Sequence, residues 1–403
     1  MAATFPIVLS NGPPPGGQAP NGRNALAEVA AAGVTMIRIG RADWGLAAVA
    51  AQLAEQRRLL DAAGAHGLHG WLWLGDAANL PPPTQPPSDA ERLLARIADG
   101  VQGHPALGAY KGVDEPRNPF RGDAWVRPAG LVRAHDRLHR LDGAHPLVIT
   151  QAPIGTLAQL TPYRPAFDIT GADVYPVSYP PGAHTQSGNR DISVVGDVTR
   201  KMVRAAGGKP VWMTLQVAWS GVAPSQQRPR LVPRFPTLQA ERFMAYQAIV
   251  NGARGLVFFG GHLTQVASPA DAELGWNWTF WQEVLRPLVA ELSSPAVGAM
   301  LVAQPTKTRA KASTADVELA TLADARFLYV VAVRRKGTTN VVSFSGLPKV
   351  IRSGEVPGEW VQKPLPPPIG AGAQVFRTVD VAGGAFRDWL APHDARVYRF
   401  RKP

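Results

Sequence analysis

Short apolar runs alternate with amphipathic stretches over residues 1–260. Eight runs are rich in β-forming residues and mostly end in Gly, Pro or polar residues, namely Phe5–Leu9, Thr35–Ile39, Gly70–Leu74, Leu107–Gly112, Leu147–Thr150, Phe167–Ala172, Val211–Leu215 and Gly255–Phe259. The stretches between them include five with helical spacing, at Ala25–Ala32, Ala47–Ala63, Ala90–Ala98, Trp125–Arg140 and Ala240–Asn251. This alternation predicts an α/β fold, a parallel (β/α)8 TIM barrel whose strands are buried on both faces. A doubly wound open sheet is the alternative, but no Gly-rich phosphate turn follows the first strand.

The pattern changes after Phe280–Leu292, which has the spacing of a last helix. Five later runs are typical of strands, namely Val317–Leu322, Phe327–Val333, Asn340–Ser345, Val375–Val381 and Ala395–Phe400. Turns are expected at Lys336-Gly337 and Gly383-Gly384, and Pro364–Gly372 is expected to be a loop because prolines cannot donate to a ladder. We therefore expect two domains, a barrel over residues 1–295 and a small antiparallel β-sandwich-like domain over residues 296–403.

Composition narrows the classes of function. Hydrophobic residues make up 45% and charged residues 18% of the chain, which allows a large core. The net charge is +12, but the basic residues are scattered, so we expect no nucleic-acid partner. Cysteine is absent, which excludes disulfides, thiolate zinc sites and cysteine nucleophiles. No apolar run approaches the roughly 20 residues that span a bilayer, so no membrane partner is expected. Localisation and oligomeric state stay open, since an exported protein whose leader was removed fits the sequence equally well.

Barrel enzymes place their chemistry at the carboxyl ends of the strands. Four such ends carry polar or aromatic side chains, at Gly108–Pro116, Asp168–Pro176, Lys209–Trp219 and Gly255–His262. These segments resemble the large clan of retaining glycoside hydrolase barrels that use two glutamates, at the ends of strands 4 and 7. The run Glu241–Gly255 is similar to their passage from helix 7 to strand 8, and Phe386–Phe400 is similar to their final β-strands.

The resemblance implies roles for two positions. In that clan strand 4 ends in Asn-Glu-Pro and the Glu is the general acid/base; here Asp114-Glu115-Pro116 stands in its place. The position of the strand 7 nucleophile holds Gln216, whose amide cannot attack an anomeric carbon. The two-glutamate mechanism is therefore not available in the form that the clan uses.

Glycoside hydrolysis needs one carboxyl to protonate the leaving oxygen and a second to attack the sugar or activate water. We assign the acid to Glu115, and a salt-bridged rim carboxylate is its structural alternative. Asp173 is the expected base or nucleophile, because side-chain alternation puts it on a different face of its strand from Asp168. Its alternative role is to cap a neighbouring loop. Asp114 is the reserve partner, or it binds a sugar hydroxyl as the clan's Asn does.

Sugar binding also needs flat apolar platforms and hydrogen-bonding groups. Aromatic candidates for the cleft are Trp71, Trp219, Trp276 and Tyr175, and candidates for hydroxyl binding are Arg38, Gln151, Gln216 and His262. Burial in the core is the competing use of each large aromatic.

No cofactor or metal is expected. His135 and His139 stand four apart on a predicted helix, but the Glu of a zinc-protease helix is missing and barrel helices lie away from the rim. We therefore interpret this pair as part of a solvated helix face. The chain also lacks a phosphate loop and a Gly-x-Ser-x-Gly motif.

These observations favour a glycosidase that cleaves an O-glycosidic bond of an oligosaccharide or polysaccharide. One alternative is a carbohydrate-binding barrel without catalysis. Another is a polysaccharide lyase or deacetylase, because one fold supports many chemistries.

Overall fold

The computed structural model describes residues 4–41, 43–118, 125–178, 181–182, 184–185, 187–218, 234–260, 268–363 and 373–402, with backbone only at 360–363 and 373–374. The chain forms two compact units. One comprises Pro6–Thr237 and Gly252–Val289, and the other comprises Met1–Phe5, Leu238–Asn251 and Ala290–Pro403. The expected division into residues 1–295 and 296–403 stays a prediction.

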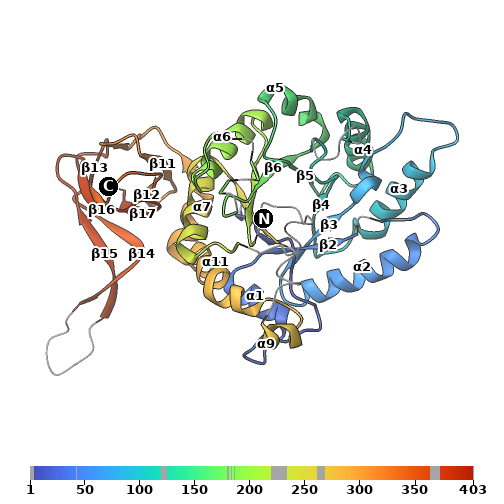
Figure 1. The fold of residues 1–403 in the computed structure, drawn as a ribbon, viewed down its shortest axis with the longest axis horizontal. Helices are drawn as coiled ribbons and strands as arrows, with labels where there is room; N and C mark the ends of the chain where they lie inside the picture. The colour runs from blue at the N-terminus through green and yellow to red at the C-terminus, as the bar shows by residue number, and fades with distance from the viewer. Residues whose placement is uncertain are drawn as a thin grey trace, which may run out of the picture. The chain divides into compact units, whose positions relative to one another are not determined.

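The first unit contains a closed barrel of eight parallel strands in sequence order, which confirms the predicted fold class (Figure 1). Its strands are β1 (Ile7–Leu9), β2 (Met36–Gly40), β3 (His69–Trp73), β4 (Leu107–Lys111), β5 (Leu147–Gln151), β6 (Ile169–Val174), β7 (Trp212–Gln216) and β8 (Gly255–Phe259). The register closes the barrel through Val8 of β1, which pairs with Met36 on one side and Val257 on the other.

Helices follow the strands, as expected from the spacing. They are α1 (Ala25–Ala32), α2 (Val49–Gly64), η1 (Gly75–Ala78), α3 (Asp89–Val101), α4 (Pro128–Leu141), α5 (Leu157–Leu160), η3 (Thr161–Ala166), α6 (Val194–Ala206) and α9 (Pro269–Glu273), while α7 (Leu238–Val250) belongs to the second unit. Local sequence fixes several helix starts: Ser88 and Glu91 form a capping box at α3, and Pro128 occupies the first turn of α4.

The helix expected at Phe280–Leu292 consists of three successive elements, α10 (Trp278–Phe280), η4 (Trp281–Leu285) and α11 (Arg286–Ser293), and α12 (Pro295–Val302) follows. In the described part of the chain no single helix has the length and apolar character to cross a membrane. One bent pair, Trp278–Ser293 with Pro295–Val302, meets both criteria together.

The second unit holds two antiparallel sheets. One has the order β10-β13-β16 and the other β15-β14-β17-β12-β11-β9. The strands are β9 (Gln304–Pro305), β10 (Lys311–Ala312), β11 (Val317–Ala323), β12 (Phe327–Arg334), β13 (Asn340–Ser345), β14 (Ser353–Lys363), β15 (Ala373–Asp380), β16 (Phe386–Leu390) and β17 (Ala395–Arg401). Five of them match the predicted runs, whereas β9, β10, β14 and β16 were not among those runs. The predicted loop Pro364–Gly372 lies outside the described residues.

The two sheets share one core, as the predicted β-sandwich requires. Phe344 and Phe386 of the smaller sheet stack with ring centroids 4.7 Å apart, and Phe386 packs on Tyr398 and Phe400 of the larger sheet at 4.8 and 5.4 Å. All four side chains are buried. The inner faces of the sheets therefore interdigitate, as in a β-sandwich.

Candidate active site

One layer of side chains defines which residues face the inside of the barrel. Each of the eight strands contributes one buried side chain to it, namely Val8, Met36, Trp71, Ala109, Val148, Ile169, Trp212 and Val257. Side chains alternate along a strand. Residues two and four positions nearer the carboxyl end of the same strand therefore also face the interior. On this pattern Asp173, four residues after Ile169, faces the interior, as the sequence predicted.

Glu115 and Asp173 converge at these carboxyl ends. An oxygen of each carboxyl and a ring nitrogen of His184 lie within 4.8 Å of one another. Glu115 follows β4 and its backbone N–H donates to the carbonyl of Thr150 at the end of β5, at 2.9 Å. The side chain of Asn118 donates to Glu115 Oε2 at 2.6 Å. Strands 4, 5 and 6 thus hold the two carboxyls in one small group.

The backbone of Glu115 is strained. Its φ is +41°, and Glu115 and His393 are the two non-glycine residues with positive φ within the described ranges. A left-handed conformation costs an L-residue on the order of 1–2 kcal/mol, and such residues cluster at functional sites. The surrounding structure therefore holds the Glu115 backbone in a conformation that the residue itself does not favour.

Burial and neighbouring charge change the ionisation of Asp173. Its side chain is 7% exposed, and burial, followed by the Glu115 carboxylate and then Asp114, raises its pKa well above the ordinary value. The carboxyls of Glu115 and Asp173 are close enough to share a proton. Tyr175, at the end of β6, is also buried and hydrogen-bonds to Asp173, and burial followed by Asp173 raises the pKa of its phenol. The surroundings of Asp173 therefore favour the protonated form of its carboxyl.

His184 joins this group from the segment after β6, and the sequence reasoning missed it. Its Nε2 lies 3.8 Å from Asp173 Oδ2, and its ring packs on Tyr175 with centroids 4.2 Å apart. Burial lowers the pKa of His184 to about 4, so the imidazole is neutral at pH 7. No local motif marks His184, because it is one of nine histidines and reaches the site through a loop.

Cationic side chains line the neighbouring strands. Lys111, the last residue of β4, is buried and forms an ion pair with Asp114. Its Nζ lies 5.4 Å from the ring centroid of Trp71 and 5.3 Å from that of Trp73. The Arg38 guanidinium lies over Trp73 at 5.0 Å. Lys111 and Trp73 were not among the predicted site residues, although alternation from Ala109 and Trp71 points both inward.

Arg38, a predicted hydroxyl-binding residue, lies within electrostatic range of Asp114 and Tyr175. Burial lowers its pKa, while the charges of Asp114 and Tyr175 act in the opposite direction. Asp114 is partly exposed and is tied to Lys111, so it is placed to bind rather than to share a proton with Asp173.

Two predicted aromatic platforms are part of the core instead. Trp71 is 1% exposed and packs edge-on against Trp212 in the interior layer of the barrel. Trp276 is equally buried, donates from Nε1 to the carbonyl of Asn11 at 2.9 Å, and packs against Trp278. Neither ring face is open to a sugar, so the competing use of large aromatics applies to both.

Gln216 is fully buried at the end of β7, and its amide is bonded to backbone. Its Oε1 accepts from the N–H of Val177 at 2.9 Å, and its Nε2 donates to the carbonyls of Val177 and Arg234 at 2.5 and 3.0 Å. A carboxylate could not make the two donated bonds. These backbone hydrogen bonds therefore explain why a glutamine occupies the position where the resembled clan has its nucleophile. They leave the amide little capacity to hydrogen-bond a sugar hydroxyl.

Gln151 is the remaining predicted residue that the structure describes, and it is not part of the group. Gln151 is buried at the end of β5, and neither atom of its amide has a partner within the described ranges. Alternation puts it on the opposite face of β5 from Val148, which faces the interior. Trp219 and His262 lie outside the described residues.

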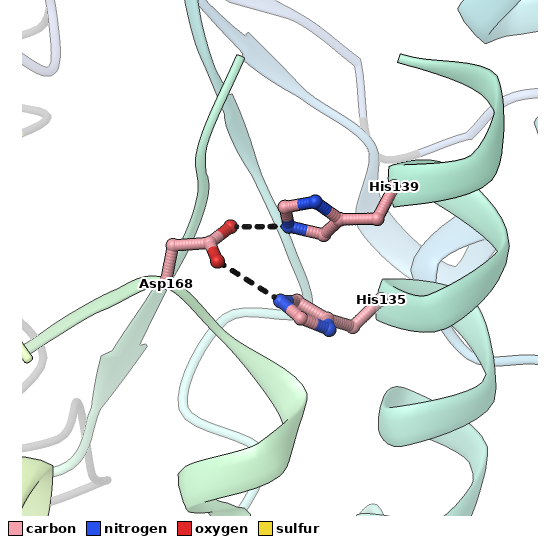
Figure 2. A group of neighbouring side chains, drawn as sticks. All are labelled: His135, His139 and Asp168. Atoms are coloured by element: carbon pink, nitrogen blue, oxygen red, sulfur yellow. Dashed lines mark hydrogen bonds and ion pairs between the residues drawn. The ribbon is translucent and has the colours of Figure 1, made fainter. Parts of the chain in front are cut away.

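The interpretation of His135 and His139 as a solvated helix face is wrong. Both rings point from α4 towards Asp168, which directly precedes β6 (Figure 2). The Nε2 atoms lie 3.1 and 2.9 Å from the two carboxylate oxygens of Asp168. The error arose because helix spacing shows which residues share a face, but not what that face packs against.

Comparison with known proteins relates the chain to others by fold alone. No protein-family model matches it, and no curated protein sequence is similar to it. Among solved structures, one described as a glycoside hydrolase superposes with a TM-score of 0.58 at 10% identity, covering 99% of this chain and 92% of that one. An α-amylase of Anoxybacillus gives 0.57 at 10% identity, covering 100% and 99%. A family 51 α-L-arabinofuranosidase from Bifidobacterium longum gives 0.53 at 13% identity, covering 99% and 96%.

Proposed function

We propose that the chain is a glycoside hydrolase that cleaves an O-glycosidic bond of an oligosaccharide or polysaccharide, with Glu115 and Asp173 as its catalytic pair. The observation that carries this proposal is the convergence of the two carboxyls at the carboxyl ends of β4 and β6. Chemistry in barrel enzymes is located at this end. The similar structures, which include an α-amylase and an α-L-arabinofuranosidase by their descriptions, agree with a carbohydrate substrate.

The separation of the carboxyls favours retention of configuration. Retaining enzymes hold their carboxyls about 5–5.5 Å apart, whereas inverting enzymes need about 6.5–9.5 Å to fit a water molecule. One oxygen of Glu115 and one of Asp173 lie within 4.8 Å of each other, which is nearer to the retaining than to the inverting separation.

The ionisation of the pair suggests how the roles are divided. The resemblance assigns the general acid to Glu115 and leaves Asp173 as base or nucleophile. The raised pKa of Asp173 instead favours Asp173 as the proton donor, because an acid catalyst must be protonated before it acts. Glu115 is then the nucleophile, held by its strained backbone and by Asn118.

A panel of aryl glycosides and polysaccharides tests the proposal, with Glu115→Gln and Asp173→Asn beside the unmodified protein. We expect turnover of at least one substrate, and loss of turnover with retained binding in both variants. Proton NMR of the first anomer released reports retention. Azide added to Glu115→Gly should yield a glycosyl azide of inverted configuration if Glu115 is the nucleophile, and of retained configuration if Glu115 is the acid. Unsaturated products or released acetate would contradict hydrolysis of a glycosidic bond.

Gln216 favours a second candidate, a carbohydrate-binding barrel without catalysis. The position that holds the nucleophile in the resembled clan has no carboxylate here. Binding of sugars without turnover of any substrate would support this candidate over the first.

A further inference from the structure

We infer that His135, His139 and Asp168 form a site for a divalent transition-metal ion such as Zn²⁺, at the end of β6 opposite the Glu115–Asp173 group. The two imidazoles come from α4 and the carboxylate from the residue before β6 (Figure 2). One ligand atom from each of the three side chains lies within 4.8 Å of the other two. Two imidazoles and a carboxylate are a ligand set that zinc uses in proteins, with a fourth position left for water.

The distances between the ligand atoms are close to those around a zinc ion. Bonds of about 2.0–2.1 Å in a tetrahedron put neighbouring ligand atoms about 3.3 Å apart. The Nε2 atoms of His135 and His139 lie 3.1 and 2.9 Å from the oxygens of Asp168. Binding of the ion requires rotations of the three side chains that bring both Nε2 atoms and one carboxylate oxygen to about 2.0–2.1 Å from a common point.

The helix and the strand hold the ligands before any ion binds. Residues four apart on a helix share a face, and the rings of His135 and His139 lie with centroids 4.4 Å apart. The backbone N–H of Leu147, at the start of β5, donates to Asp168 Oδ2 at 2.8 Å and fixes the carboxylate. Hydrogen bonds of this kind to the outer side of a ligand orient it and support metal affinity.

A second observation concerns the other nitrogen of His135. Its Nδ1 is buried and makes no hydrogen bond, and it lies 3.6 Å from Asp136 Oδ1. If neutral His135 donates from Nε2 to Asp168, Nδ1 is a bare lone pair facing a carboxylate. An ion bound at Nε2 would put the proton on Nδ1, where it faces Asp136 favourably. The metal-bound tautomer therefore suits the surroundings of His135 better.

Access to the group also fits an ion. The side chains of His139 and Asp168 are 36% and 28% exposed, which leaves a path for the ion and a coordinated water.

The test uses the full chain without a histidine tag, first stripped with EDTA and then titrated with Zn²⁺ by calorimetry and by equilibrium dialysis with elemental analysis. We expect one ion per chain at this site, with affinity at least about 100-fold weaker in His139→Ala and in Asp168→Asn. His104→Ala is the matched control, because His104 Nε2 contacts Asp61 Oδ1 at 3.0 Å with a single imidazole. Its zinc affinity should not change.

Two measurements keep the outcome unambiguous. Zn²⁺ should shift the imidazole NMR signals of His135 and His139 in the unmodified protein, which does not depend on how the variants fold. Glu115→Gln removes one member of the other histidine-carboxylate group, so any second ion lost in that variant belongs to Glu115, Asp173 and His184. Equal zinc affinity in the unmodified protein, His139→Ala and Asp168→Asn, or no binding at about 100 μM, would overturn the inference.

Discussion

Asp168 directly precedes β6 and Asp173 lies near its carboxyl end, yet the pKa values of their carboxyls are shifted in opposite directions. Asp168 receives hydrogen bonds from two imidazoles and a backbone N–H, and its pKa lies below the ordinary value. Asp173 is buried beside the carboxylates of Glu115 and Asp114, and its pKa lies well above it. The surroundings of Asp168 therefore favour its ionised form, whereas those of Asp173 favour its protonated form.

The difference shows that a residue's partners decide its chemistry. Burial acts to raise the pKa of both carboxyls. Donors reverse the effect at Asp168, and neighbouring anions reinforce it at Asp173. The donors around Asp168 suit cation binding, and the anions around Asp173 suit proton transfer. The difference follows from the segments that contact each end of β6.

The largest expected effect concerns catalysis by Asp173. Asp173→Asn should lower kcat by about 10²–10⁴-fold, because the amide cannot donate or accept the transferred proton. Asp168→Asn should leave kcat within about threefold under EDTA, since it acts at the opposite end of the strand. Steady-state kinetics on the best substrate of the panel measures both. Similar losses in the two variants would contradict the separation of roles.

A further carboxylate at the same end should be costly rather than useful. Gln216→Glu removes two hydrogen bonds donated to the carbonyls of Val177 and Arg234 and buries a charge, so we expect a loss of about 2–4 kcal/mol in the free energy of unfolding. Gln151→Glu is the matched control, because the Gln151 amide has no described partner to lose. Urea unfolding measures the difference. A gain in turnover by Gln216→Glu would show that the two-glutamate mechanism had been restored.

Removing the ionised carboxylate should cost less. Without metal, Asp168→Asn weakens the charge-assisted hydrogen bonds from His135 and His139, and we expect a loss of about 1–3 kcal/mol in the free energy of unfolding. Asp136→Asn, at a side chain that is 56% exposed, should change this free energy by less than about 0.5 kcal/mol. Urea unfolding in EDTA compares them, and equal losses would argue against a special role for Asp168.

The smallest effect is a slope against pH. The folded pKa of Asp173 is raised, so its contribution to stability is complete below the unfolded value of about 3.9 and is lost as pH rises towards the folded value. Asp173→Asn cannot ionise and should gain stability relative to the unmodified protein over that range, by at most about 1.4 kcal/mol per pH unit. Thermal unfolding at several pH values measures the slope. A relative loss of stability with rising pH would show that Asp173 is ionised in the folded protein.

The barrel could be predicted because its signal is local and repeated. Apolar runs such as Leu147–Thr150 are nearly continuous since both faces of a parallel strand are buried. Alternation along β6 also placed Asp173 correctly. Strand β14 was missed because Gly354, Pro357 and Gly358 interrupt its pattern, and its pairing with β15 shifts register in that stretch.

The site was predicted less completely because its members meet through tertiary contacts. His184 reaches Asp173 through a loop, and His139 meets Asp168 across 29 residues of sequence. Alternation alone could not assign Trp71 to the core or to the cleft. Core positions and cleft positions lie on the same face of β3 and differ only in how near they are to its carboxyl end. The backbone partners of the Gln216 amide were equally invisible in the sequence.

The length of β6 has a practical consequence. Five residues at about 3.3 Å each separate Asp168 from Asp173 by roughly 17 Å, beyond the range over which substitutions usually influence one another. An engineer could therefore redesign the histidine end of this barrel, to hold a different ion or a label, and leave the acid chemistry of the opposite rim untouched. The double variant should then behave as the sum of its parts.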